Sequence, residues 1–272
     1  MRPVVSIMNS SNLPDANQAY AFYGSRASFS PMSFQRATSA YGHKGLRGAW
    51  VALLYSLPMR DAKATAPGPA REMALVITGA SGSILPTHLI PLMMQHGRLD
   101  RLHLVMTEAA CTVASEELSP DSASAEGLIS RMDLPLEARN RIVCWENSDL
   151  TAPVASGSHL LAGVVVLPCS SGTAGALANG ISRGLAQRLG DVALKERRPL
   201  ILGIRESPMS PILLENLLKL SRAGALIMPP VPAFYLRSRP DAFLDDFLSA
   251  YCLRILDMLG IHLERPELRW GE

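Results

Sequence analysis

Short apolar runs, each followed by a loop of small, polar or proline residues, are the feature that most constrains how this chain folds. Residues 199–204 (PLILGI), 164–167 (VVVL) and 224–228 (GALIM) are three such runs. They are too short for helices and predict strands, and residues 199–204 fit a strand buried on both faces. Such strands are typical of a parallel sheet that helices cover on both sides.

Further segments alternate strand and helix along the chain. Strands are predicted at residues 74–78 and 101–106, a variable helical connection at 119–140, and helices at 89–96, 108–118, 174–179, 180–198, 212–223 and 241–261. We therefore expect an α/β fold with an open parallel sheet, in which ligands bind outside the carboxyl ends of the strands.

Composition narrows the class of protein. The chain has 272 residues and is 48% hydrophobic, which is ample for a packed core. A net charge of +2 gives no basic field of the kind that binds nucleic acid. The four cysteines form no Cys-x-x-Cys pair and fit a reducing compartment. No apolar run approaches the roughly 20 residues that span a bilayer, so no membrane span is expected.

Residues 1–72 differ from the rest and are expected to be a disordered leader or extension. They are rich in Ser, Ala, Tyr and Arg, with Asp15 as the only acid before Asp61. The composition resembles a transit peptide, and residues 44–66 mimic a displaced secretory signal. We favour a third explanation, in which the functional chain starts at Met73 and residues 73–272 form the folded domain.

Polar residues follow several predicted strands at the carboxyl edge. Arg205 and Glu206 come directly after residues 199–204, and either mark a site or form a surface ion pair that closes a turn. The GASGS turn at residues 79–83 offers backbone N–H groups to an anion, although the full G-x-G-x-x-G spacing is absent. Thr107 either meets the same ligand or caps the helix that follows.

A second group of polar residues lies farther along the chain. Residues 170–173 (SSGT) offer hydroxyls and amides at a helix start, with simple N-capping as the alternative. In the next helix Arg188 and Lys195 are seven residues apart, so they share a face that suits a phosphate. For Arg183, Arg197 and Arg198, a solvated face is the expected role.

Together these motifs resemble the UbiX-type flavin prenyltransferases. The resemblance covers about residues 73–272 and rests on PCSSGT, ANGIS, RLGDVALKERRPLIL, RESP, LLENLLKLSRAGA, IMPPVPAFY, RILDMLGI and RWGE. It implies a Rossmann-like three-layer flavoprotein fold with a mostly parallel sheet, assembled as a dodecamer with active sites at subunit interfaces. It also implies transfer of a dimethylallyl group from dimethylallyl monophosphate to reduced FMN, without a metal. The prenylated FMN would pass to a UbiD-type decarboxylase.

The resemblance also assigns roles to single residues. Expected FMN-binding residues are Gly79, Ala80, Ser81, Thr107, Ser156, Ser170, Ser171, Gly172, Thr173 and Arg205. The phosphate of the prenyl donor is expected to bind Arg188, Lys195, Tyr235 and Arg254. Glu206 would relay protons during ring closure, and the expected catalytic residues are Ser81, Arg188, Lys195 and Glu206.

Some positions depart from the family pattern and leave alternatives open. Leu150 stands where some members carry an aromatic residue, and Arg237 is a stand-in for Arg254. An FMN-binding accessory subunit of an aromatic acid decarboxylase and a flavin-dependent cysteine decarboxylase are the alternative functions. The sequence does not distinguish quinone biosynthesis from aromatic acid breakdown. The expected location is the cytoplasm, or the mitochondrion if residues 1–72 are a transit peptide.

Overall fold

The computed structural model describes residues 71–95, 99–236 and 243–270. The chain divides into two units, Met1–Thr65 and Ala66–Glu272, and the described residues all belong to the second. The expected leader, apart from its last two residues, and the stand-in Arg237 lie outside the described residues. No helix within the described ranges has the length and apolar character needed to cross a bilayer.

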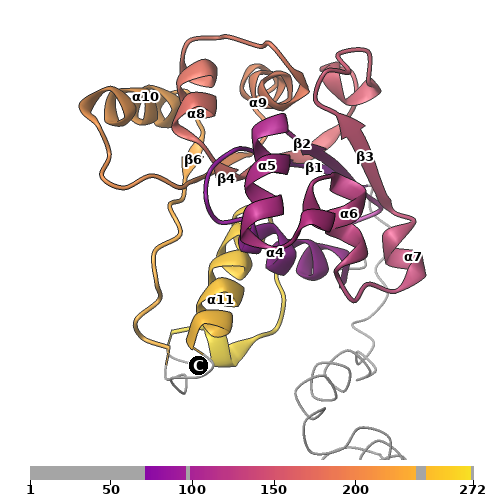
Figure 1. Cartoon of the computed structure of the whole chain (residues 1–272). Helices are drawn as coiled ribbons and strands as arrows, with labels where there is room; N and C mark the ends of the chain where they lie inside the picture. The colour runs from indigo at the N-terminus through magenta and orange to yellow at the C-terminus, as the bar shows by residue number, and fades with distance from the viewer. Residues whose placement is uncertain (1–70, 96–98, 237–242, 271–272) are drawn as a thin grey trace, which may run out of the picture. The chain divides into compact units, whose positions relative to one another are not determined.

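The described part forms a six-stranded, all-parallel sheet with the order β3-β2-β1-β4-β5-β6 (Figure 1). The strands are β1 (Glu72–Ile77), β2 (Arg101–Met106), β3 (Ile142–Glu146), β4 (Leu161–Cys169), β5 (Leu200–Ile204) and β6 (Leu226–Ile227). The helices are α4 (Ile84–Gln95), α5 (Glu108–Glu117), α6 (Ala125–Ser130), α7 (Leu136–Arg139), α8 (Ser171–Ala178), α9 (Leu185–Lys195), α10 (Pro211–Arg222) and α11 (Phe243–Met258). Short 3₁₀ turns are η2 (Pro120–Ser122), η3 (Pro153–Ala155) and η4 (Pro266–Leu268).

Two hydrophobic cores lie on opposite faces of the sheet. In β1, Leu75 and Ile77 belong to one core with residues of α4 and α11, whereas Ala74 and Val76 belong to the other with residues of α8, α9 and α10. Figure 1 shows α8, α9 and α10 on one side of the sheet and α4 and α11 on the other. Successive strand residues point to opposite faces, which is why the central strands read as unbroken apolar runs. The expected three-layer α/β fold is confirmed.

Most of the predicted elements are present, with shifted ends. β2 has the predicted bounds, and the expected strand at 164–167 extends to the nine residues of β4. The helix expected at 180–198 spans only Leu185–Lys195. Gly180, with a φ of +66°, follows the end of α8, and Arg197, with a φ of +55°, lies beyond the end of α9. α4 begins at Ile84 and includes Pro86, which the first helical turn tolerates because its N–H groups have no carbonyl partner.

One strand was not predicted. β3 pairs only with β2, and all five of its residues are partly or fully exposed. An edge strand of this kind does not need the continuous apolar run that marks the central strands, so its sequence gives a weak signal.

Candidate active site

The loops that follow β1 and β4 lie side by side at the carboxyl edge of the sheet. The chain proceeds from β1 to β2 and β3 on one side and then crosses to β4 on the other side, so the strand order reverses between β1 and β4. Thr78, a residue that the sequence analysis missed, joins the two loops: its Oγ1 donates to the carbonyl oxygen of Pro168 at 2.8 Å and accepts from the Ser170 amide at 2.8 Å. A reversal point of this kind is the usual ligand crevice of an open parallel sheet.

Within the turn after β1, a carboxylate of the chain itself takes the place expected for a ligand anion. Glu117, at the end of α5, accepts from the amides of Gly82 at 2.9 Å and Ser83 at 2.7 Å. Burial alone would raise the pKa of Glu117, but hydrogen bonds from Ser81, Ser83 and Gly82 bring it below its usual value. The amides of Gly82 and Ser83 are therefore already paired, and the anion-binding interpretation does not hold for them.

Thr107 and Ser170 both act as helix caps. Thr107 Oγ1 accepts from the Ala110 amide at 3.2 Å at the start of α5, and Ser170 Oγ accepts from the Thr173 amide at 3.2 Å at the start of α8. The capping alternative is confirmed for both. The cap satisfies the Thr173 amide, whereas the amides of Ser171 and Gly172 have no carbonyl partner within the helix. A Cβ added at Gly172 would meet no atom within 4 Å. The space in front of this helix start is therefore open.

Arg205 connects the end of β5 to the turn after β1. Its Nε donates to the carbonyl oxygen of Ser81 at 3.2 Å, and its side chain lies beside Gly82. Glu206 is exposed, and its carboxylate accepts from the Ser207 amide at 3.1 Å. No ion pair joins Arg205 to Glu206 in the part of the chain that the structure covers, so the surface ion pair interpretation is wrong for these two residues.

A second group of predicted residues gathers along α9. Arg188 Nε donates to the carbonyl oxygen of Ala155 at 2.9 Å, and its guanidinium pairs with Asp191 at 2.9 Å. Lys195 lies against Gly157, where an added Cβ would come within 2.5 Å of Nζ. Both cations therefore contact the segment around Ser156, as expected for one helix face.

The expectation of a solvated face fails for Arg198. Its guanidinium donates to the carbonyl oxygens of His159 at 2.7 Å and Gly157 at 2.6 Å. Arg198 therefore fixes the turn that carries Ser156, and it is only partly exposed.

A third group surrounds a pocket of about 340 Å³ beside α11. Tyr235, Arg254, Asp257, Arg269 and Trp270 are among its lining residues. The rings of Tyr235 and Trp270 meet edge to face with centroids 5.4 Å apart, and Asp257 pairs with Arg269 at 3.0 Å and with Arg254 at 3.5 Å. Within one chain the structure brings Tyr235 and Arg254 together but leaves Arg188 and Lys195 outside this pocket.

Comparison with known proteins decides the family. A family model described as Flavoprotein matches residues 63–242. A protein named flavin prenyltransferase UbiX from Alkalihalophilus pseudofirmus is 39% identical over 202 residues, which is 74% of this chain and 96% of the relative. The chain belongs to the UbiX family of flavoproteins. The resemblance on which the sequence analysis relied is confirmed.

Other UbiX relatives agree in sequence and in structure. A UbiX of Methanocaldococcus jannaschii is 38% identical over 74% of this chain and 98% of its own length. The solved structure of AnUbiX (PadA1) in complex with FMN and dimethylallyl pyrophosphate has a TM-score of 0.61 at 33% identity, covering 75% of this chain and 98% of that one. A dodecameric FMN-dependent UbiX-like decarboxylase of Escherichia coli O157:H7 has a TM-score of 0.62 at 33% identity, covering 74% and 100%.

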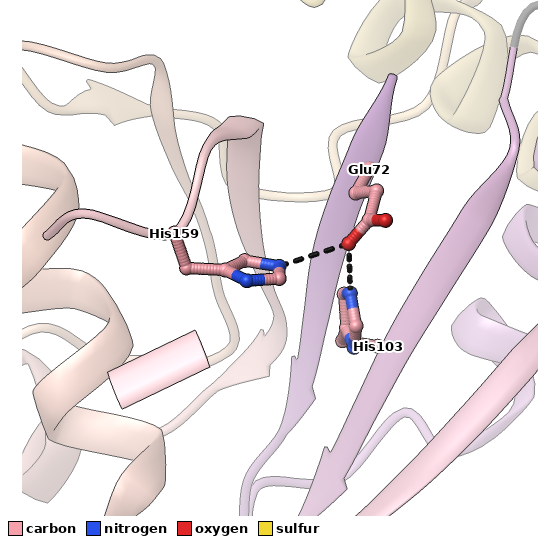
Figure 2. A group of neighbouring side chains, drawn as sticks. All are labelled: Glu72, His103 and His159. Atoms are coloured by element: carbon pink, nitrogen blue, oxygen red, sulfur yellow. Dashed lines mark hydrogen bonds and ion pairs between the residues drawn. The ribbon is translucent and has the colours of Figure 1, made fainter. Parts of the chain in front are cut away.

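A further cluster, at the amino ends of the strands of this UbiX domain, escaped the sequence analysis (Figure 2). Glu72 Oε2 lies 2.8 Å from Nε2 of both His103 and His159, so these three residues form a group of metal-ligand type. The three residues are far apart in sequence. The only indication of the cluster in the sequence is His103, a titratable residue within a predicted strand.

Proposed function

We propose that this UbiX family member is a flavin prenyltransferase that transfers a dimethylallyl group from dimethylallyl monophosphate to reduced FMN. The observation that carries the proposal is the 39% identity to a protein named flavin prenyltransferase UbiX over 96% of that relative's length. The AnUbiX complex, which holds FMN together with dimethylallyl pyrophosphate, supports FMN and a dimethylallyl phosphate ester as the two ligands.

The residues at the carboxyl edge fit a flavin mononucleotide. Amides of Ser171 and Gly172 stand at the start of α8, where helix geometry favours a phosphate, and the space beyond Gly172 is open. On this proposal Gly79, Ala80, Ser81, Thr107, Ser170 and Thr173 form the walls of the FMN site, and Arg205 holds the turn after β1 against the end of β5. Reduced FMN supplies the electron-rich ring that accepts the prenyl group.

The donor phosphate is held by four groups that one chain presents in two places. Arg188 and Lys195 lie along α9, and Tyr235 and Arg254 line the pocket beside α11. Several cations around a leaving phosphate stabilise the charge that grows as the carbon–oxygen bond breaks. We infer a homo-oligomer in which the two groups come from different copies, and the dodecameric E. coli relative supports such an assembly.

Glu206 is the proposed proton carrier. It is exposed at the carboxyl edge, one residue beyond Arg205, and its carboxylate accepts a hydrogen bond from the Ser207 amide. A carboxylate in this position accepts a proton from the reacting ring and delivers one to the leaving phosphate. Ser81, the other proposed catalytic residue of the carboxyl edge, lies on the turn after β1, which Arg205 holds in place.

The proposal also covers the protein that receives the product and the cellular compartment in which the chain works. Prenylated FMN would pass to a UbiD-type decarboxylase. We propose a cytoplasmic protein. Its folded domain includes Glu72, the first residue of β1, so the boundary expected at Met73 lies inside that strand. The relative from Saccharomyces cerevisiae named as mitochondrial keeps the mitochondrial alternative open for a chain with a functional leader.

One assay tests the activity. The full chain is incubated anaerobically with reduced FMN and dimethylallyl monophosphate, and the flavin is extracted for mass spectrometry. The expected product is heavier than FMN by one C5H8 unit, and incubation without the donor is the control. A chain that binds FMN but never yields the heavier flavin from either the monophosphate or the pyrophosphate would refute the proposal.

A further inference from the structure

The turn of residues 156–159 is held from two sides. On one side, Arg198 donates to the carbonyl oxygens of Gly157 and His159 at 2.6 and 2.7 Å. On the other side, the His159 ring reaches across to β1, where its Nε2 lies 2.8 Å from Glu72 Oε2 (Figure 2). A turn with exposed residues on both sides of Gly157 is thus connected to the first strand of the sheet and to the end of α9.

The group of Glu72, His103 and His159 resembles a two-histidine, one-carboxylate metal site, but its hydrogen bonds argue against a metal. Trp145 Nε1 lies 3.0 Å from His103 Nδ1. An indole N–H only donates, so Nδ1 accepts and the proton of the neutral ring is on Nε2, which points at Glu72. A ligating nitrogen has to be unprotonated. Arg101, 3.6 Å from Glu72 Oε1, adds a positive charge that opposes a cation.

The same hydrogen bonds make Glu72 a fixed acceptor. His103 is 2% exposed and is held between Trp145 and the carboxylate, and burial lowers its pKa, which keeps the ring neutral. Burial alone would raise the pKa of Glu72, yet hydrogen bonds from His103 and His159 lower it, so the acceptor stays ionised. His159, 25% exposed and located in the turn, is the partner that can move.

This turn carries or contacts three residues of the proposed site, two of which also pair with acidic neighbours, Arg188 with Asp191 and Lys195 with Glu196. Ser156 is part of it, and Ser156 Oγ lies 2.8 Å from Ser158 Oγ. Lys195 packs so closely on Gly157 that a Cβ there would approach Nζ within 2.5 Å. Arg188 donates to Ala155, the residue before the turn. Displacement of the turn would therefore shift Ser156 and change the surroundings of both cations.

We propose that Glu72 and His159 are positioning residues for the prenyl transfer site. The hydrogen bond from His159 Nε2–H to Glu72 holds residues 156–159 against α9, so that Arg188 and Lys195 present a fixed surface to the donor phosphate and Ser156 keeps its place beside FMN. The assignment rests on the proposed function and adds residues remote from the carboxyl edge to it.

The test compares three variants of the full chain. His159→Leu removes the donor, and His159→Gln keeps an N–H that reaches Glu72. His88→Leu is the matched control, because His88 is 23% exposed and also lies beside a carboxylate, that of Asp245 at 3.7 Å. Hydrogen exchange of the amides of residues 157–160 should be about tenfold faster in His159→Leu, since a hydrogen bond to a charged group is lost. His159→Gln and His88→Leu should match the wild type.

Kinetic measurements distinguish a positioning role from a purely structural one. KM for dimethylallyl monophosphate should rise about tenfold in His159→Leu with kcat little changed, and His159→Gln should restore it. Unchanged exchange in His159→Leu, or faster exchange with unaltered KM and FMN affinity, would overturn the proposal, as would a His159→Gln variant as impaired as His159→Leu. If the wild type makes no prenylated flavin, the proposed function fails. The role of Glu72 and His159 is then decided by the hydrogen-exchange rates and the FMN affinities of the variants alone.

Discussion

Arg205 donates from Nε to the carbonyl oxygen of Ser81 across 3.2 Å and so joins two loops that are 124 residues apart in sequence. Ser81 belongs to the turn after β1, and Arg205 follows β5, two strands away in the sheet. This contact closes the carboxyl edge around the reversal point and gives the proposed FMN site a fixed wall.

Replacing Arg205 should weaken FMN binding. Arg205→Ala removes the hydrogen bond to Ser81 and a cation at the site, so the dissociation constant for FMN should rise about tenfold to a hundredfold. Flavin fluorescence titration measures it. Arg222→Ala, at the exposed end of α10, is the control and should bind FMN like the wild type. Equal affinity in both variants would contradict a role for Arg205 in the FMN site.

Glu206→Gln should separate binding from chemistry. The amide keeps the size of the side chain but cannot carry a proton, so FMN affinity should stay the same while kcat falls by roughly a hundredfold or more. Stopped-flow absorbance follows FMN binding and turnover, and the mass of the product shows whether the prenyl group was transferred. Glu215→Gln, exposed on α10, is the control, and a Glu206→Gln variant with wild-type turnover would exclude the proton role.

Glu117 should give the folded chain a pH-dependent stability. Its folded pKa lies below the ordinary value of 4.5, so its contribution is present above that value and is lost as pH falls through the folded pKa. The urea midpoints of wild type and Glu117→Gln should therefore differ at pH 7 and converge on acidification below about pH 4. The neighbouring exposed Glu116→Gln should show no such difference. A difference in urea midpoint between wild type and Glu117→Gln that stays constant with pH would show that the ionised carboxylate of Glu117 is not the source of the stabilisation.

Asp257 should stabilise the C-terminal segment. Its side chain is 6% exposed and accepts from both terminal nitrogens of Arg269 at 3.0 Å, so Asp257→Asn should lower the free energy of unfolding by roughly 2 kcal/mol. Chemical denaturation measures the change, and the exposed Asp133→Asn serves as the control. A loss no larger than that of Asp133→Asn would show that the pairing contributes nothing.

Trp145→Phe should raise the pKa of His103. The indole N–H bonds to the lone pair of Nδ1 and so favours the neutral ring, and phenylalanine removes this donor while keeping the ring burial. NMR titration of the imidazole nitrogens measures both the pKa and the tautomer. A wild-type His103 with its proton on Nδ1 would contradict the assigned hydrogen bonds.

The sequence revealed the fold more fully than the site. The apolar runs of β4 and β5 predicted strands because burial on both faces leaves little room for polar residues. β3 was missed because its edge position relaxes that demand. The roles of the residues at the carboxyl edge came from the resemblance to the UbiX family. The parallel sheet explains why the loops that carry them lie close together.

Contacts between distant residues were not readable from the chain. Glu117 lies 35 residues from Gly82, and Glu72 lies 87 residues from His159, so no local pattern marks either pair. Arg198 was assigned to a solvated face because a run of charges on a helix usually is one. Its bonds to Gly157 and His159 depend on where the following loop passes.

The separation of Arg188 and Lys195 from Tyr235 and Arg254 within one chain has a genetic consequence. If each reaction centre is shared between copies, a chain lacking Lys195 and a chain lacking Arg254, each inactive alone, would together form some centres with both residues intact. Co-expression of the two defective chains would then recover part of the activity, whereas mixing two chains defective in the same group would not.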